Sequence, residues 1–266
     1  MLQIFQYDFM VRALEAGLMI ALIAPAIGMF LVVKRYSLLT DTLSHVSLVG
    51  VAFSALTGLA PTLGALIVSS LAALGIEELR ARKNLFGESV LALVLSGSLA
   101  LAIVLFSLVH GIGINLISIL FGSITTVSHA DLPLIALCTL LVLGIVGIAF
   151  KKLFLLAYDE ELAKANGLPV RALNVLLVLL AAVTVSISIR IVGTLLVGAL
   201  MVIPVLTATQ FKQGFAKTYL WAIVLSVISV ALGLCASFYL NLPSGGAIVL
   251  VALVFFLASV LLQKQR

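Results

Sequence analysis

Charged residues are scarce in this chain. Asp, Glu, Lys and Arg make up 9% of its 266 residues, whereas hydrophobic residues make up 64%. A soluble domain cannot bury so much apolar surface, so the composition excludes a soluble globular protein and indicates a membrane protein built from helices. Cysteine is also scarce. Cys138 and Cys235 lie in separate apolar runs, where free thiols behave as small hydrophobic groups, so neither a disulfide nor a thiolate metal site is expected.

Motifs of catalysis are absent as well. The sequence contains no Walker A pattern, so the chain is not expected to hydrolyse ATP. It contains neither HExxH nor GxSxG, which argues against an intramembrane protease. The net charge of +5 does not indicate nucleic-acid binding, because the basic residues are sparse and lie between apolar runs. We therefore expect a membrane protein that is not an enzyme, has no nucleic-acid partner and binds no cofactor of its own.

Long apolar runs dominate what is present. They predict an all-α, polytopic transmembrane bundle of about eight to nine spans, folded as a single domain over residues 1–266. The first run spans a bilayer and stops at Lys34 and Arg35, so it is expected to be an anchor and not a cleaved signal peptide. Residues 114–132 are too short and interrupted for another crossing, and a re-entrant or interfacial segment is predicted there. The candidate spans are roughly residues 13–33, 38–59, 61–76, 89–109, 131–150, 171–189, 191–210, 218–240 and 246–262.

Basic residues predict the orientation of the bundle. Alternate loops carry Lys and Arg, whereas the opposite loops, near residue 59 and over residues 110–131 and 241–246, carry none. By the positive-inside rule the basic side is cytoplasmic, and the N-terminus then lies outside unless one of the short early spans fails to cross. The basic positions that fall on this one side are Lys34, Arg35, Arg80, Arg82, Lys83, Lys151, Lys152, Lys164, Arg171, Lys212, Lys217, Lys264 and Arg266.

An acid and an imidazole, Asp41 and His45, lie within the second apolar run, in the stretch SLLTDTLSHVSLVG over residues 37–50. Their spacing of four places both side chains on one helical face, where a carboxylate oxygen and an imidazole nitrogen can bind one zinc or manganese ion. A structural alternative stays open, in which Asp41 caps the helix and His45 hydrogen-bonds to a neighbouring helix. Ionisable groups inside a membrane are costly, however, and tend to be functional.

The number of ligands predicts an assembly. A zinc or manganese ion usually takes four or more ligands, so Asp41 and His45 of one chain leave the site incomplete. Two copies related by a twofold axis can bring two such pairs together, which predicts a homodimer with the second span lining the shared path. Val49 continues the same face by one turn. The alternative is a site completed within each chain.

The longest basic loop contains the stretch KKLFLLAYDEELAKANGLPVR over residues 151–171. Leu155, Leu162, Ala165 and Leu168 fall near one helical face, and the acids near another, so an amphipathic helix is predicted over about residues 154–168. The run of acids over residues 159–161 would be repelled by an anionic inner leaflet, which favours a protein partner over a lipid surface.

Several segments together resemble a known family. They are DTLSHVSLVGVAF (41–53), LFGSITTVSHADL (120–132), YDEELAKANGL (158–168), IVGTLLVGALMVIPVLTA (191–208) and LPSGGAIVL (242–250). In this order they resemble the membrane subunit of the bacterial ABC importers for zinc, manganese or iron. The resemblance implies a multi-pass protein of the bacterial cytoplasmic membrane and a transported metal, zinc or manganese in the first place and iron as a further candidate.

The resemblance also implies roles and partners. Asp41 and His45 match the acid and histidine of the family's metal pathway. The family's coupling helix, which docks in the ATPase, matches Tyr158, Asp159, Glu160, Glu161, Ala163 and Gly167. The implied partners are a second copy of the chain, two ATP-binding cassette ATPase subunits and an extracytoplasmic metal-binding protein.

A rival class stays open at this point. In a gradient-driven secondary metal transporter, Asp41 would carry protons, although such a transporter needs no acidic docking helix on its cytoplasmic side. The polar residues that remain are less informative. His110 and His129 lie in outer loops, where they can attract metal or contact the binding protein, or be merely solvated. Arg190 is expected to snorkel or to pair with Glu15.

Overall fold

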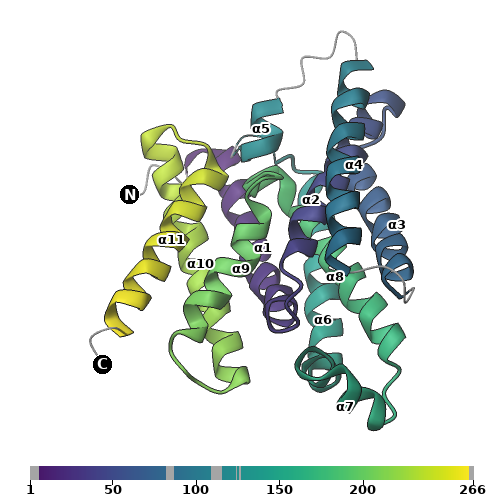
Figure 1. Cartoon of the computed structure of the whole chain (residues 1–266). Coiled ribbons are helices and arrows are strands. Elements are labelled where there is room, and N and C mark those ends of the chain that lie inside the picture. The colour runs from purple at the N-terminus through teal and green to yellow at the C-terminus, as the bar shows by residue number, and fades with distance from the viewer. Residues whose placement is uncertain (1–5, 82–86, 109–115, 124, 126, 264–266) are drawn as a thin grey trace.

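The computed structural model describes residues 6–81, 87–108, 116–123, 125 and 127–263. All regular elements in this part of the chain are helices, as expected for an all-α bundle, and eight of them are long and apolar enough to cross a membrane (Figure 1). The helices are α1 (Asp8–Val33), α2 (Leu38–Thr57), α3 (Pro61–Ala81), α4 (Gly87–Leu108), α5 (Leu116–Phe121), α6 (Asp131–Tyr158), α7 (Glu160–Ala165), α8 (Val170–Val192), α9 (Val197–Thr209), α10 (Phe215–Leu240) and α11 (Ser244–Gln263).

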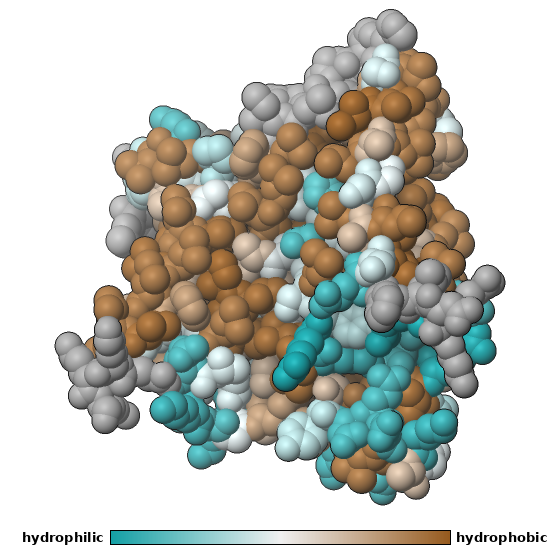
Figure 2. All heavy atoms as spheres, in the orientation of Figure 1, coloured by the Kyte–Doolittle hydropathy of each residue, from teal (hydrophilic) through white to brown (hydrophobic). Residues whose placement is uncertain are grey.

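The bundle has a buried centre and an apolar rim. α1, α2 and α8 are largely buried, and α1 packs against α6, α8, α9 and α10. α4 and α6 lie at the rim and point large apolar side chains outward, as at Leu93 and at Ile148, which is 90% exposed. Figure 2 shows these hydrophobic surfaces as a brown band, with hydrophilic atoms gathered at the end that carries α7. Such a band is the surface that faces lipid.

The two ends of the bundle carry different residues. Lys34, Arg80 and Arg171 lie at the end that carries α7. Asp8, at the start of α1, contacts His129 in the loop before α6, at the opposite end. This arrangement agrees with the predicted topology, in which the basic end is cytoplasmic and the N-terminus lies outside.

The predicted span over residues 191–210 is not a single full-length helix. α8 continues to Val192, and α9 begins only at Val197 and has 13 residues, so it is about 20 Å long against a hydrocarbon thickness of about 30 Å. The cause is Gly193, which has a φ of +84° and lies so close to the backbone of Leu120 and Gly122 that any side chain would overlap with it. Glycine is the residue that allows both the positive φ and the close approach.

α5 occupies the space next to this break. The N–H groups of Thr194 and Leu195 donate hydrogen bonds to the carbonyl groups of Ile119 and Leu120, both at 3.1 Å. Ile119 and Leu120 also pack against a cluster that contains Val49, which lies midway along α2. α5 therefore packs into the bundle beside this break without crossing it, and the predicted choice between a re-entrant and an interfacial segment stays a prediction.

The helix predicted over about residues 154–168 is divided into two. α6 runs on to Tyr158, the chain becomes extended at Asp159, and α7 covers only Glu160–Ala165. The predicted apolar face is also wrong, because Leu162 and Ala165 are exposed and Ala163 is the fully buried side chain of α7. An acid at position 159 favours a helix start over a helix interior, because its carboxylate can cap the next turn.

Candidate functional site

The first candidate site lies on α2. Asp41 is exposed and His45 is half-buried, and their side chains interact electrostatically on one face of the helix. Among the described residues, the Asp41 carboxylate caps no backbone group of α2, and the buried Nδ1 atom of His45 has no hydrogen-bond partner. The structural alternative of a helix cap and an interhelical hydrogen bond therefore has no support in the observed contacts. A buried polar atom without a protein partner calls for an explanation such as a ligand or an ordered water.

The N-terminus of α9 meets this pair. Gly198, in the first turn of α9, is packed against Asp41, and a Cβ atom built at Gly198 would overlap with Asp41 Oδ1 and lie 2.9 Å from Thr40 Oγ1. The carboxylate thus lies against the positive end of the α9 dipole. Helices that begin inside the membrane beside a polar site are a feature of transporters, because their free N–H groups and dipole act on charge in the apolar interior.

No third ionisable side chain of the described residues joins Asp41 and His45. In the described residues, no group of three or more His, Cys, Asp or Glu side chains lies close enough to hold a metal ion. Val49, one turn beyond His45, is buried against α4 and α5, so the polar part of this face ends at His45. In Figure 2 a few hydrophilic atoms interrupt the brown surface in the region of α2 and α9. Asp41 is exposed in the single chain.

The second candidate site is α7, at the basic end of the bundle. The Asp159 carboxylate accepts a hydrogen bond from the Leu162 N–H at 2.9 Å, and this N-cap fixes the start of the helix. Ala163 is buried against the bundle, so the opposite side of α7 is free. Gly167 has a φ of +75° and ends the segment. Exposed side chains at this site are Tyr158, Glu161, Leu162 and Lys164.

A cleft adjoins α7. It has a volume of about 910 Å³ and lies between α7 and the start of α8. Acidic, basic and apolar side chains line it, so it can accept a protein segment of mixed character. The lining includes Glu160, Glu161, Lys164, Leu168 and Pro169.

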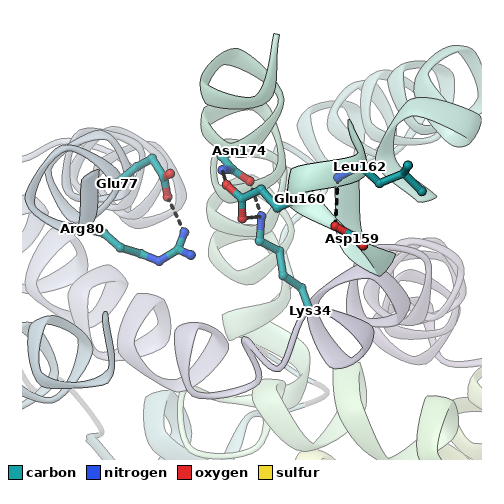
Figure 3. Close-up of polar contacts among 7 residues, drawn as sticks. All are labelled: Lys34, Glu77, Arg80, Asp159, Glu160, Leu162 and Asn174. Carbon is teal, nitrogen blue, oxygen red and sulfur yellow. Dashed lines mark hydrogen bonds and ion pairs between the residues drawn. The ribbon is translucent and has the colours of Figure 1, made fainter. Parts of the chain in front are cut away.

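Glu160 points toward the bundle, unlike its neighbour Glu161. Its carboxylate lies 3.4 Å from Lys34 Nζ and accepts a hydrogen bond of 2.8 Å from the Asn174 amide (Figure 3). Lys34 also donates to the Asn174 carbonyl oxygen. Burial alone would raise the pKa of Glu160, but the Lys34 ammonium and the hydrogen bonds outweigh burial and lower it. Burial lowers the pKa of Lys34, against the opposing effect of Glu160.

The sequence did not identify these partners. Lys34 is separated from Asn174 by 140 positions, and hydropathy assigns Lys34 only a topological role. The one signal was Asn174 itself, an amide in the first turns of an apolar run.

On the outer side, Arg190 forms an ion pair with Asp131 at 2.7 Å, and Thr62 donates to the same carboxylate at 3.1 Å. The expected pairing of Arg190 with Glu15 is replaced by this contact. His129 contacts Asp8 at 3.0 Å and both are exposed, whereas His110 lies outside the described residues. These contacts tie α3, α6 and α8 together at their outer ends.

Ionisable groups on an apolar helix, beside a short helix that begins within the bundle, are typical of membrane transporters. The chain belongs to the ABC 3 transport family, whose model matches residues 6–263. It is 36% identical over 260 residues to a probable metal transport system membrane protein of Treponema pallidum, covering 97% of both chains. It is 33% identical over 264 residues to the manganese transport system membrane protein MntC of Listeria innocua, covering 98% of this chain and 94% of that one.

A solved structure shares the fold. The structure of PsaBC from Streptococcus pneumoniae in complex with Fab aligns with a TM-score of 0.86 and 30% identity, covering 96% of this chain and 92% of that one. The chain is therefore a multi-pass permease of the metal ABC transport type in the bacterial inner membrane.

Proposed function

We propose that this chain is the transmembrane subunit of an importer that moves zinc or manganese into the cytoplasm, driven by ATP hydrolysis on a separate subunit. The observation that carries the proposal is the Asp41 and His45 pair, held on one face of α2 against the N-terminus of α9. Oxygen and nitrogen ligands suit divalent metals of the zinc and manganese class. Iron stays a further candidate, because its divalent ion accepts the same donors.

The importer acts as a homodimer. Asp41 is exposed in the single chain, and Leu38 on the same side of α2 is 40% exposed. A carboxylate on a membrane span is stable only against water or protein, so a second copy facing α2 covers it and supplies two further ligands. The metal path then runs along the two α2 helices.

ATPase subunits dock on α7 and in the cleft beside it. The exposed side chains of Tyr158, Glu161, Leu162 and Lys164 combine charge and apolar surface, as protein interfaces do. The family is one of ABC permeases, and an extracytoplasmic binding protein would deliver the metal to the outer ends of the helices. A gradient-driven carrier would have no use for a free α7 surface of this kind.

Reconstitution tests the proposal. The chain, purified with and without a co-expressed ATPase subunit, is placed in liposomes, and uptake of Mn²⁺ and Zn²⁺ is measured with ATP on the cytoplasmic side. We expect uptake only when ATP and the ATPase are both present, with no effect of a proton ionophore. Uptake that follows a proton or sodium gradient without the ATPase would contradict the proposal and favour a secondary transporter.

A further inference from the structure

Three residues from separate helices form a closed polar cluster at the cytoplasmic end (Figure 3). Lys34 caps the C-terminus of α1, Glu160 begins α7, and Asn174 lies in α8. Each contacts the other two, through the Lys34–Glu160 ion pair, the Asn174–Glu160 hydrogen bond and the Lys34–Asn174 hydrogen bond. The cluster therefore connects α7 directly to the end of α1.

The cluster is more than a surface ion pair. The Lys34 side chain is 8% exposed and Asn174 is buried, whereas the Glu160 side chain is 43% exposed. A buried ammonium is tolerated only where its partners replace water, and breaking such a pair leaves an uncompensated charge. α7 is already held by the Asp159 cap and by buried Ala163. Anchoring α7 thus does not by itself require a buried lysine.

Lys34 also belongs to the turn that connects α1 to α2. Lys34 begins the turn between α1 and α2, in which Arg35 adopts a φ of +59° and the Tyr36 N–H donates to the Leu31 carbonyl at 2.7 Å. The Arg80 guanidinium lies 4.0 Å from the centre of the Tyr36 ring. The turn is thus fixed from two sides and behaves as a stiff connection.

A second contact holds Arg80 in place. Its guanidinium lies 3.3 Å from the Glu77 carboxylate, one turn earlier on α3 (Figure 3). The α1–α2 turn therefore lies between two anchors, α7 through Lys34 and α3 through Tyr36. Movement of α7 relative to α3 must act on this turn, which leads within a few residues to Asp41 on α2.

We propose that the Lys34–Glu160–Asn174 cluster transmits movement of α7 to α2, so that an ATPase docked on α7 acts on the metal path through the α1–α2 turn. This inference rests on the proposed function, which supplies the ATPase on α7 and the path along α2. Lys34 and Glu160 are positioning residues: they act on the metal path through the α1–α2 turn, and the exposed edge of Glu160 also lines the cleft beside α7. Their loss uncouples hydrolysis from transport without dissociating the ATPase.

The experiment uses the permease–ATPase complex in liposomes. ATP hydrolysis, Mn²⁺ uptake and retention of the ATPase in a pull-down are measured for Lys34→Met, Glu160→Gln and the charge swap Lys34→Glu with Glu160→Lys. The swap is informative because the Asn174 amide has both a donor and an acceptor and can serve the reversed pair. Glu78→Gln is the matched control, since it breaks the exposed Arg171–Glu78 pair at the same end without involving the α1–α2 turn.

The proposal expects a specific pattern. Each single variant retains the ATPase and hydrolyses ATP, but moves about tenfold less Mn²⁺ per ATP, a factor typical of coupling between sites. The charge swap restores most of the ratio, and Glu78→Gln leaves it unchanged. If a single variant does not fold, the swap still tests the pairing.

Two results would overturn the proposed role of the Lys34–Glu160–Asn174 cluster. An unchanged ratio of Mn²⁺ to ATP in both single variants would reject the link, as would a folded swap with no recovery. Failure of the unaltered chain to retain any ATPase is a different result, because it would reject the proposed function itself.

Discussion

His45 lies on α2 with a buried ring nitrogen that has no hydrogen-bond partner among the described residues, and its replacement tests the metal path at the level of one side chain. We expect His45→Ala to lower Mn²⁺ uptake by about tenfold or more. Mutation of residues that only support a metal ligand already costs about that factor in metal affinity or activity, and loss of a ligand should cost at least as much. Uptake by reconstituted complexes is the measurement. His129→Ala is the matched control, since this histidine is exposed and paired with Asp8 on the outer surface. Normal uptake by a stable His45→Ala complex would remove α2 from the metal path.

Gly198 gives a second prediction at this scale. A Cβ atom at this position meets Asp41 and Thr40, so Gly198→Ala must displace the carboxylate or the first turn of α9. We expect strongly reduced uptake from a complex that still assembles. Gly144→Ala on α6 is the control, because nothing lies near its Cβ position, and alanine there should raise helix stability by about 0.5–1 kcal/mol. Equal uptake by the two variants would show that the contact with Asp41 is dispensable.

At the scale of elements, α7 presents two acids with different surroundings. Glu161 is exposed, whereas Glu160 is tied to Lys34. Glu161→Lys is expected to weaken retention of the ATPase, more at low than at high salt, because like charges at an interface repel and salt screens them. A pull-down across a salt series measures this, with Glu88→Lys on α4 as a control of the same charge change. Unaltered retention of the ATPase at every salt concentration would show that the ATPase docks on a surface other than α7.

The sequence predicted those helices that hydropathy alone can identify. The long spans follow from runs of apolar residues, and the structure has them. Hydropathy does not register the break at Gly193, because that break depends on a close approach of α5 from far away in the chain. Hydropathy also does not distinguish Glu160 from Glu161. The two differ because Glu160 contacts Lys34 and Asn174, which are distant from it in the sequence. The Asp41 and His45 pair was identifiable because its geometry is local to one helix, whereas its contact with α9 is not.

The whole molecule is predicted to be a homodimer facing along α2. With Cys138 and Cys235 replaced by alanine, Leu38→Cys should form a crosslinked dimer with a short bismaleimide. Ile148→Cys, on the lipid-facing rim of α6, is the control that should stay uncrosslinked. Denaturing gels measure both. A sample that is dimeric by mass but shows no Leu38 crosslink would place the α2 helices apart, with a separate metal path in each chain.

The shortness of α9 has a consequence for how the protein is made. As a helix of 13 residues, α9 is too short to span the hydrocarbon by itself, and its ends would leave backbone groups in lipid. In the folded chain α1, α2, α10 and α11 cover it. We therefore expect α9 to reach its folded position only after α10 and α11 have been inserted. Biogenesis of the protein then depends on these two C-terminal helices. A chain truncated after Lys212 is expected to be degraded rapidly in a pulse-chase measurement, whereas a stable truncated chain would show that α9 inserts unaided.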